Sequence, residues 1–196
     1  MNEHEEERGH GVRIAYLDCF SGISGDMFVA AFLDAGVRLG ELRELLQRLP
    51  VTGWSIRTEN TKRGSLAATR FVVETDEGVQ RDREAPHGQP GAGSAHVHTD
   101  ERCLSEILDV IEKSSLPASV KDLSSRVFSE LAGAEAQVHG VKPGEVHFHE
   151  VGALDSVIDI VGAACCLHLS GVEKLYASTL SVGKGRIASP SSVLPP

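Results

Sequence analysis

The stretch EVHFHEVGALDSVIDIVG (residues 145–162) gathers two histidines and several carboxylates in an otherwise apolar segment. Side chains alternate between the two faces of a strand, so VHFHE would place His147 and His149 on one face and Phe148 on the other. Imidazole nitrogens bind transition metals, and carboxylates can fill the remaining coordination positions. His147, His149 and the adjacent Glu150 therefore form a candidate metal site, and an exposed H-x-H edge is the alternative.

An apolar-periodic run follows Gly152 and predicts a helix. Asp155 and Asp159 are four residues apart in this run, so they share one helix face. We expect this face to lie close to the two histidines, with Asp159 as a further metal ligand and with Glu150 and Asp155 as catalytic acids. The alternative is that these carboxylates are ordinary solvated acids.

A second histidine cluster lies in residues 77–99, which contain Gly, Pro and charged residues but almost no large apolar side chain. This composition predicts a flexible linker. His87, His96 and His98 in such a segment indicate metal capture, and a plain linker is the alternative. A mobile metal-capturing segment before a fixed site would suit a protein that moves a metal ion.

The segment AYLDCFSGISGDM (residues 15–27) predicts a strand, a glycine turn and the start of a helix. Ligands in α/β proteins bind at the carboxyl ends of strands, and free N–H groups at a helix N-terminus attract phosphate. The segment matches neither GxGxxG nor a Walker loop, and Asp26 has the alternative role of complementing the helix dipole. The candidate catalytic acids here are Asp18 and Asp26, and the candidate cofactor-binding residues are Ser21, Gly22, Ser24 and Gly25.

The remaining histidines and the cysteines have ordinary structural interpretations. Glu135 and His139 are i, i+4 partners that could hold a metal, but a helix-terminal histidine stabilised by the helix dipole is favoured, as it is for His168. The cysteines form no CxxC pair, which predicts reduced, mostly buried thiols and leaves thiolate ligation as the alternative. They are Cys19, Cys103, Cys165 and Cys166.

Alternating strand and helix patterns predict an α/β fold with a mixed sheet, packed helices and a His-containing flexible linker in the middle. Strands are expected at VRIAYLDCF and in a hairpin formed by WSIRTE and LAATRFVVET, joined by the turn NTKRGS. The predicted division is a disordered tail at 1–11, an α/β subdomain with the SGISGD loop at 12–76, the linker at 77–99, a helical/αβ subdomain with the HFHE motif at 100–187 and an irregular tail at 188–196.

The formal net charge of −9 argues against nucleic acid as a partner and favours cations. No apolar run approaches the roughly 18 to 20 residues that span a bilayer, and the acidic N-terminus lacks the apolar core of a signal peptide. We therefore expect no membrane association and a cytoplasmic location.

Four stretches, in this order, resemble one family: LDCFSGISGDM, the histidine tract, AEAQVHG and HFHEVGALDSVIDIVG. They look like the LarC family of nickel insertion proteins in nickel-pincer cofactor synthesis. The resemblance implies a CTP-dependent nickel chelatase, or cyclometallase, of the lyase class. Such an enzyme inserts Ni²⁺ into pyridinium-3,5-bisthiocarboxylic acid mononucleotide, forming one carbon–nickel and two sulfur–nickel bonds. The product is the cofactor of lactate racemase and related enzymes.

The resemblance implies that His147, His149 and Glu150 lie in the most distinctive motif and that the linker histidines gather nickel. It fades near Ile187, whereas the family has a second half associated with the nucleotide triphosphate. We therefore expect this chain to be the nickel-binding amino-terminal portion. CTP with Mg²⁺ or Mn²⁺ would bind in a carboxy-terminal half, which is an expected partner, and an oligomer is expected. Two alternatives remain: a nickel carrier without catalytic activity and a metal-dependent phosphoester hydrolase.

Overall fold

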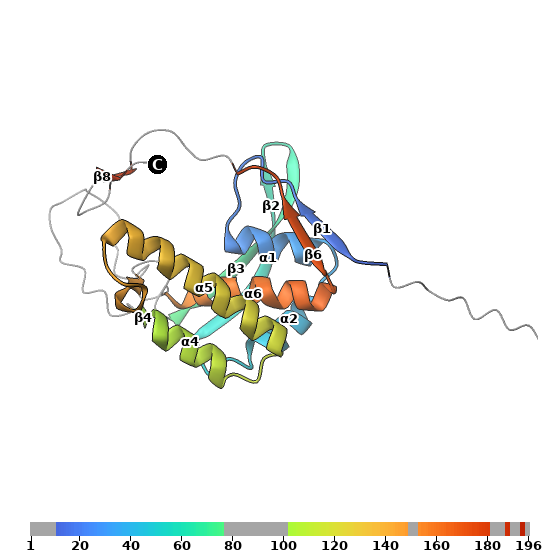
Figure 1. The fold of residues 1–196 in the computed structure, drawn as a ribbon. Helices are drawn as coiled ribbons and strands as arrows, with labels where there is room; N and C mark the ends of the chain where they lie inside the picture. The colour runs from blue at the N-terminus through green and yellow to red at the C-terminus, as the bar shows by residue number, and fades with distance from the viewer. Residues whose placement is uncertain (1–10, 77–101, 149–152, 181–186, 189–192, 195–196) are drawn as a thin grey trace, which may run out of the picture. The chain divides into compact units, whose positions relative to one another are not determined.

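The computed structural model describes residues 11–76, 102–148, 153–180, 187–188 and 193–194 (Figure 1). The chain divides into two compact units. The larger unit is Ser24–Ser170, and the smaller unit combines Met1–Ile23 with Gly171–Pro196. The predicted division at 12–76 and 100–187 has different boundaries and stays a prediction, and the predicted linker lies outside the described residues.

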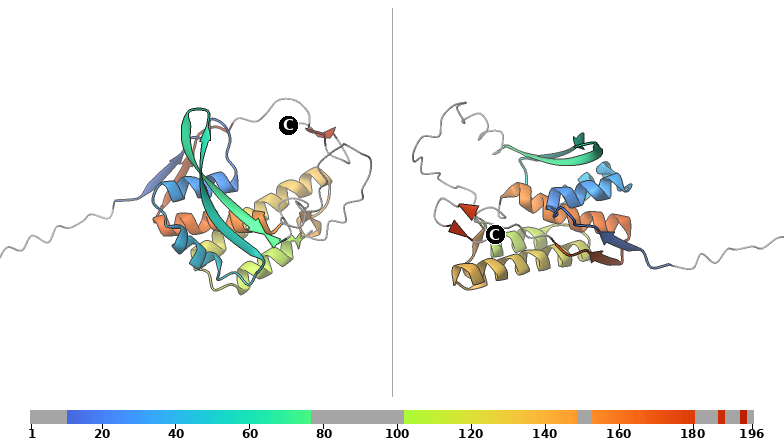
Figure 2. Two further views of the ribbon diagram at one scale, coloured as in Figure 1. Left: turned by 180° about the vertical axis from the view of Figure 1, so that it is seen from behind. Right: turned by 90° about the horizontal axis from the view of Figure 1, so that it is seen from above.

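Helix α6 (Leu154–Ser170) is the centre of the larger unit. It packs against α1 (Gly25–Asp34), α2 (Leu39–Leu46), α5 (Ala118–His139) and strand β3 (Leu66–Thr75). The right-hand view of Figure 2 shows β3, α1, α6 and α5 in successive layers. Because α6 is covered on several sides, most of its apolar residues are buried: Leu154, Val157, Ile158, Val161, Ala164, Cys165 and Cys166.

The other helices follow the apolar periodicity of the sequence. In α2 the leucine stripe Leu42, Leu45 and Leu46 is buried. Helix α5 ends at Gly140, whose φ of 67° is the left-handed conformation that glycine adopts readily. Helix α4 (Leu104–Lys113) packs against α5. None of the helices that the structure describes is both long and apolar enough to span a bilayer.

The predicted hairpin is confirmed: its second strand has the predicted bounds, and its first strand is longer than expected. Strand β2 (Trp54–Arg63) pairs with β3 in antiparallel register, from Trp54 opposite Thr75 to Arg63 opposite Leu66. Most of the predicted turn NTKRGS therefore belongs to β2, because Gly64, with a φ of 60°, lets the chain reverse within two residues.

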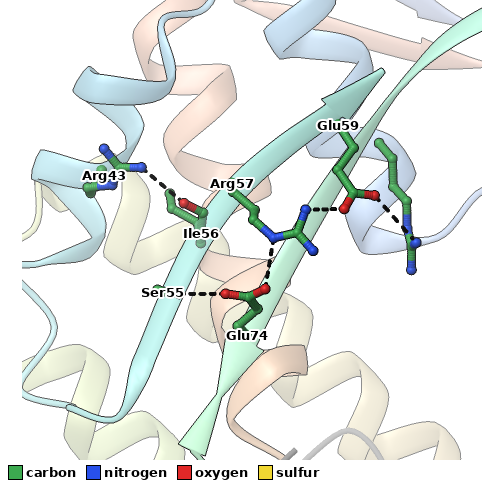
Figure 3. Close-up of polar contacts among 7 residues, drawn as sticks. Arg43, Ser55, Ile56, Arg57, Glu59 and Glu74 are labelled. Atoms are coloured by element: carbon green, nitrogen blue, oxygen red, sulfur yellow. Dashed lines mark hydrogen bonds and ion pairs between the residues drawn. The ribbon is translucent and has the colours of Figure 1, made fainter. Parts of the chain in front are cut away.

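Polar side chains cross the hairpin and connect it to α2 (Figure 3). Arg57 Nε donates to Glu74 Oε1 over 2.8 Å, and Arg57 also pairs with Glu59. The hydrogen bond from Arg57 is the largest cause of the lowered pKa of Glu74. Arg43 Nη2 donates to the backbone oxygen of Ile56 over 3.0 Å. The exposed ion pairs contribute little stability, so their main effect is to favour one strand register.

Strand β5 (His147–Phe148) pairs with β4 (Arg102–Cys103) in an antiparallel ladder. Phe148 is fully buried, and its ring packs edge-on against Phe128 of α5 at 6.3 Å between centroids. His147 is exposed. The predicted alternation of His147 and Phe148 is confirmed, and His149 lies outside the described residues.

Two short ladders lie in the described part of the smaller unit. Strand β1 (Ile14–Leu17) pairs in parallel with β6 (Lys174–Ala177), and β7 (Ile187–Ala188) pairs antiparallel with β8 (Val193–Leu194). The α/β class is thus confirmed, with parallel and antiparallel pairs in separate two-stranded sheets of the described residues. The tail predicted as irregular contributes β8 and one residue of β7.

Replacing Phe148 with alanine should lower the free energy of unfolding by about 3–5 kcal/mol, because it leaves a cavity against Phe128. Urea unfolding followed by circular dichroism measures this. The control is Val138→Ala on the exposed side of α5, where 69% of the residue is accessible and a change within about 0.5 kcal/mol is expected. Equal effects of the two variants would contradict the packing described.

Candidate functional site

The first turn of α1 lies against the second turn of α6, although the two helices are far apart in the sequence. A Cβ atom added at Gly25 would fall 2.8 Å from Asp159 Cβ and 3.3 Å from Asp159 Oδ2. Real Cβ atoms do not approach other atoms so closely, because packed interiors leave no room for overlap. The absence of a side chain at Gly25 is therefore what lets Asp159 occupy its place.

A second glycine allows close packing further along α6. A Cβ at Gly162 would lie 3.4 Å from Val29 Cγ2 and 4.0 Å from Leu46 Cδ1. Gly162 is buried, so the side chains of α1 and α2 rest directly on the backbone of α6. The two glycines together hold α1 at short distance from α6.

This packing brings carboxylates from two predicted motifs together in what we call the acid cluster: Asp26, Asp155 and Asp159. Burial raises the pKa of Asp159 to about 7, with further contributions from the charges of Asp26 and Asp155. Within the described part of the chain, the buried Oδ1 of Asp159 makes no hydrogen bond. Near neutral pH Asp159 therefore carries either a proton or a negative charge that lacks a hydrogen-bond donor at Oδ1 among the described residues.

The two flanking acids have local partners at their helix N-termini. Ser24 Oγ donates to Asp26 Oδ1, and the backbone N–H of Ser156 donates to Asp155 Oδ1 over 2.7 Å. Acids in a first helical turn are also favoured by the helix dipole. Asp26 and Asp155 are thus positioned by their own helices, whereas Asp159 faces the cluster without such support.

An arrangement of this kind can hold a proton or a cation. Oxygen ligands suit hard divalent ions and can complete a site begun by imidazoles. Among the residues that the structure describes, no three His, Cys, Asp or Glu side chains converge into a complete metal site. The acid cluster can therefore supply part of a donor set, and its completion would need groups beyond these three acids.

The structure describes only one residue of the predicted histidine sites. His147 lies beside the start of α4, where its charge is one of the smaller causes of a lowered Glu106 pKa. The main cause is the 2.9 Å hydrogen bond that Glu106 accepts from the backbone N–H of Cys103. The roles of the other predicted ligands stay predictions, because they lie outside the described residues: His87, His96, His98, His149 and Glu150.

The remaining part of the glycine-turn motif belongs to the smaller unit. Asp18 is exposed directly after β1, and Ser21 is exposed in the following turn. The backbone N–H of Gly22, at a φ of 85°, donates to Cys19 O over 3.0 Å. The backbone N–H of Cys19 in turn donates to Ser178 Oγ over 2.8 Å. Phosphate binding by this turn stays a prediction.

The histidines interpreted as structural have protein partners. His139 Nε2 lies 3.8 Å from Glu135 Oε1 on α5, and His168 Nδ1 lies 3.1 Å from Ser119 Oγ. The predicted helix-terminal placement is confirmed, since His139 is the last residue of α5 and His168 lies in the last turn of α6.

The four cysteines are free, and all but Cys103 are buried. Burial raises the pKa of Cys165 and of Cys166 to about 12. A thiol with such a pKa does not ionise at neutral pH, so these two side chains are poor thiolate ligands. The predicted reduced, mostly buried thiols are confirmed.

A cavity of about 330 Å³ between α1 and the hairpin was not predicted from the sequence. Asp26 lines it, together with Asp34, Arg70 and Phe71. The sequence holds one indication of this cavity: Asp26 and Asp34 are eight residues apart, so both lie on one side of a helix. Their approach to Arg70 and Phe71 depends on tertiary packing, which no local pattern records.

The sequence model of one family, described as nickel insertion protein, matches residues 15–196. The chain belongs to the nickel insertion protein family. The match extends past Ile187, where the resemblance read from motifs faded. No solved structure matches the chain significantly.

Curated relatives agree with this membership. A protein of Roseiflexus castenholzii, whose name gives nickel insertion as a provisional role, is 48% identical over 93% of this chain and 41% of its own length. A protein of Acetivibrio thermocellus is 42% identical over 94% of this chain and 42% of its own length. It is named pyridinium-3,5-bisthiocarboxylic acid mononucleotide nickel insertion protein. The chain thus spans less than half the length of these relatives.

Replacing Gly25 with alanine should destabilise the protein by about 1–3 kcal/mol, because the added methyl overlaps Asp159. The matched control is Gly133→Ala within α5, where an added Cβ meets nothing within 4 Å and the better helix propensity should stabilise by up to about 1 kcal/mol. Urea unfolding measures both. A Gly25→Ala protein as stable as the control would contradict the close approach of α1 and α6.

The acid cluster also predicts a dependence of stability on pH. Between pH 3.8 and about 7 the folded state keeps a proton on Asp159 that the unfolded state has lost, so stability falls as pH rises through this window. Asp159→Asn removes this penalty. In a chelator-containing buffer at pH 8, the variant should be more stable than the parent chain by on the order of 2 kcal/mol, after allowance for partial exposure.

The gain from Asp159→Asn should shrink as the pH falls from 8 to 4 and vanish below pH 3.8, where the parent carboxyl is protonated in both states. The control is Asp109→Asn, because Asp109 is exposed and pairs with Lys113 at 2.5 Å. It should show no gain at pH 8. A gain from Asp159→Asn that is the same at pH 4 and pH 8 would show that charge in the cluster is not its cause.

Proposed function

We propose that this chain binds Ni²⁺ as a substrate and presents it for insertion into pyridinium-3,5-bisthiocarboxylic acid mononucleotide. The observation that carries the proposal is the acid cluster, because it joins acids of SGISGDM and of ALDSVID at a buried carboxylate oxygen that has no hydrogen bond among the described residues. Family membership supports nickel as the ion, and the printed name of the Acetivibrio relative supports the organic substrate.

The proposed part of Asp159 follows from its surroundings. A divalent cation beside Asp159 would replace the proton that this carboxyl holds near neutral pH and would relieve its repulsion with Asp26 and Asp155. Imidazoles are the better nickel ligands, so the predicted set His147, His149 and Glu150 would supply the nitrogen donors. The acids would then balance the charge of the ion.

The protein's part in this reaction would be binding, orientation and electrostatics, whereas the precursor supplies its own sulfur ligands. The proposal includes formation of one carbon–nickel and two sulfur–nickel bonds, coupled to CTP hydrolysis, as a chelatase of the lyase class. CTP and its divalent cation would bind in the portion of the relatives that this chain does not span. The product would serve lactate racemase-type enzymes in the cytoplasm.

A second candidate function is a nickel carrier that performs no chemistry. It rests on the same acid cluster, because carboxylates gathered around Asp159 can hold a cation without taking part in a reaction. A carrier would bind nickel stoichiometrically without CTP cleavage, whereas the full enzyme would couple the two.

Nickel titration by calorimetry on the 196-residue chain, with zinc as competitor and with or without CTP, tests the proposal. We expect about one tight nickel ion per chain, bound more weakly at pH 6 than at pH 8 because protons compete for Asp159 and the histidines. Asp159→Asn should weaken binding at least about tenfold, equivalent to about 1.4 kcal/mol. Asp109→Asn, an exposed control, should have no effect.

The histidine clusters are compared in the same titration. His147→Ala combined with His149→Ala should weaken nickel binding much more than His96→Ala combined with His98→Ala. The opposite order would show that the VHFHE strand is structural. Nickel binding that neither Asp159→Asn nor the strand variant changes would remove the proposed site altogether.

A further inference from the structure

The cavity between α1 and the β2–β3 hairpin has the size and position of a small-molecule site. Figure 2 shows the hairpin lying along one side of α1. The volume of about 330 Å³ falls within the range of ligand pockets in proteins, which begins near about 300 Å³. All of its lining residues belong to the larger unit, so the cavity is a property of that unit alone.

Small and apolar side chains make up most of the cavity walls. Ala30 and Ala31 line it from α1, and Ala68 lines it from β3. Phe71, which is 2% exposed, and Met27, which is half exposed, add an aromatic ring and a thioether. Thioethers contact aromatic rings favourably, so these walls suit a flat ring lying between the helix and the strand.

The charged residues of the cavity are of both signs. Asp26 and Asp34 stand at the two ends of α1, separated by a helical rise of about 12 Å. Thr69 Oγ1 donates to Asp34 Oδ1 over 3.0 Å, which fixes that carboxylate against the strand. Two acids near an apolar slot favour a ligand with a positive ring.

Arg70 provides the opposite charge. Its Nη1 atom lies 3.7 Å from Glu59 Oε2; the side chain of Arg70 is 59% exposed and that of Glu59 is 36% exposed. An exposed pair at that distance is weak, so Arg70 can turn to an anion at little cost. A guanidinium is well suited to phosphate because it can donate two parallel hydrogen bonds.

Asp26 connects the cavity to the acid cluster, because it lines the one and belongs to the other. We infer that the cavity binds the pyridinium mononucleotide substrate class. The positive ring would lie between α1 and β3 near the carboxylates, with its phosphate at Arg70. This inference rests on the proposed function, and it would place ring substituents beside the cluster that holds the metal ion.

The test uses nicotinic acid mononucleotide as a pyridinium mononucleotide probe, titrated into the 196-residue chain by calorimetry. Ala68→Phe fills the cavity and should weaken probe binding at least about tenfold. Arg126→Ala on the exposed side of α5, where Arg126 lies 3.8 Å from Asp122, is the control and should leave binding unchanged. Circular dichroism checks that each variant is folded.

Arg70→Ala separates phosphate recognition from a structural effect. The parent chain should bind the mononucleotide more tightly than nicotinic acid riboside, which lacks the phosphate. In Arg70→Ala this preference should be lost, while affinity for the riboside stays the same. A preference unchanged by Arg70→Ala would overturn the assignment of the phosphate to Arg70.

Nickel titration of the same variants distinguishes this inference from the proposed function. Loss of probe binding with nickel binding retained in Ala68→Phe supports the cavity as the nucleotide site. If the parent chain binds nickel but not the probe, or if Ala68→Phe binds the probe as well as Arg126→Ala does, the inference is overturned and the proposed function stands. If the probe binds in the cavity and nickel does not bind, the proposed function fails instead.

Discussion

Helix α1 approaches helix α6 closely because Gly25 and Gly162 present no side chain where the two helices touch. At the first contact the space that a Cβ would need is filled by Asp159, and at the second it is next to Val29. Since α6 is also the helix on which α2, α5 and β3 pack, the place of α1 is set by the main core of the larger unit. Asp26 comes next to Asp159 as a consequence of this packing.

The acid cluster lowers the stability of the fold, and this loss suggests that the cluster has a function. Partly burying Asp159 beside two other acids raises its pKa to about 7, and its Oδ1 atom has no hydrogen bond among the described residues. A protein optimised only for stability would place an uncharged side chain there. Carboxyls with a raised pKa are often found at functional sites, because a ligand can supply the positive charge that the protein does not place beside them. A cation is the ligand that this arrangement favours, which agrees with membership of a nickel insertion family.

Local patterns in the sequence predicted the helices and strands well, but they predicted poorly which of them pack against one another. The hairpin and the helix that follows Gly152 are readable because each depends on neighbours within a few residues. The hairpin turn was placed too broadly, since only the tertiary structure shows β2 continuing to Arg63. Asp26 and Asp159 were both singled out as candidates, but their proximity depends on the contact at Gly25. The cavity beside them also escaped prediction, because Asp34 and Thr69 meet only when α1 packs on the hairpin.

We propose that the approach of α1 to α6 creates the place where nickel is held. X-ray diffraction at the nickel absorption edge, on crystals of the 196-residue chain soaked with nickel, locates the ion directly. We predict an anomalous peak beside the carboxylates of Asp26 and Asp159. A nickel peak away from both carboxylates, for example at the exposed His147 alone, would contradict the account.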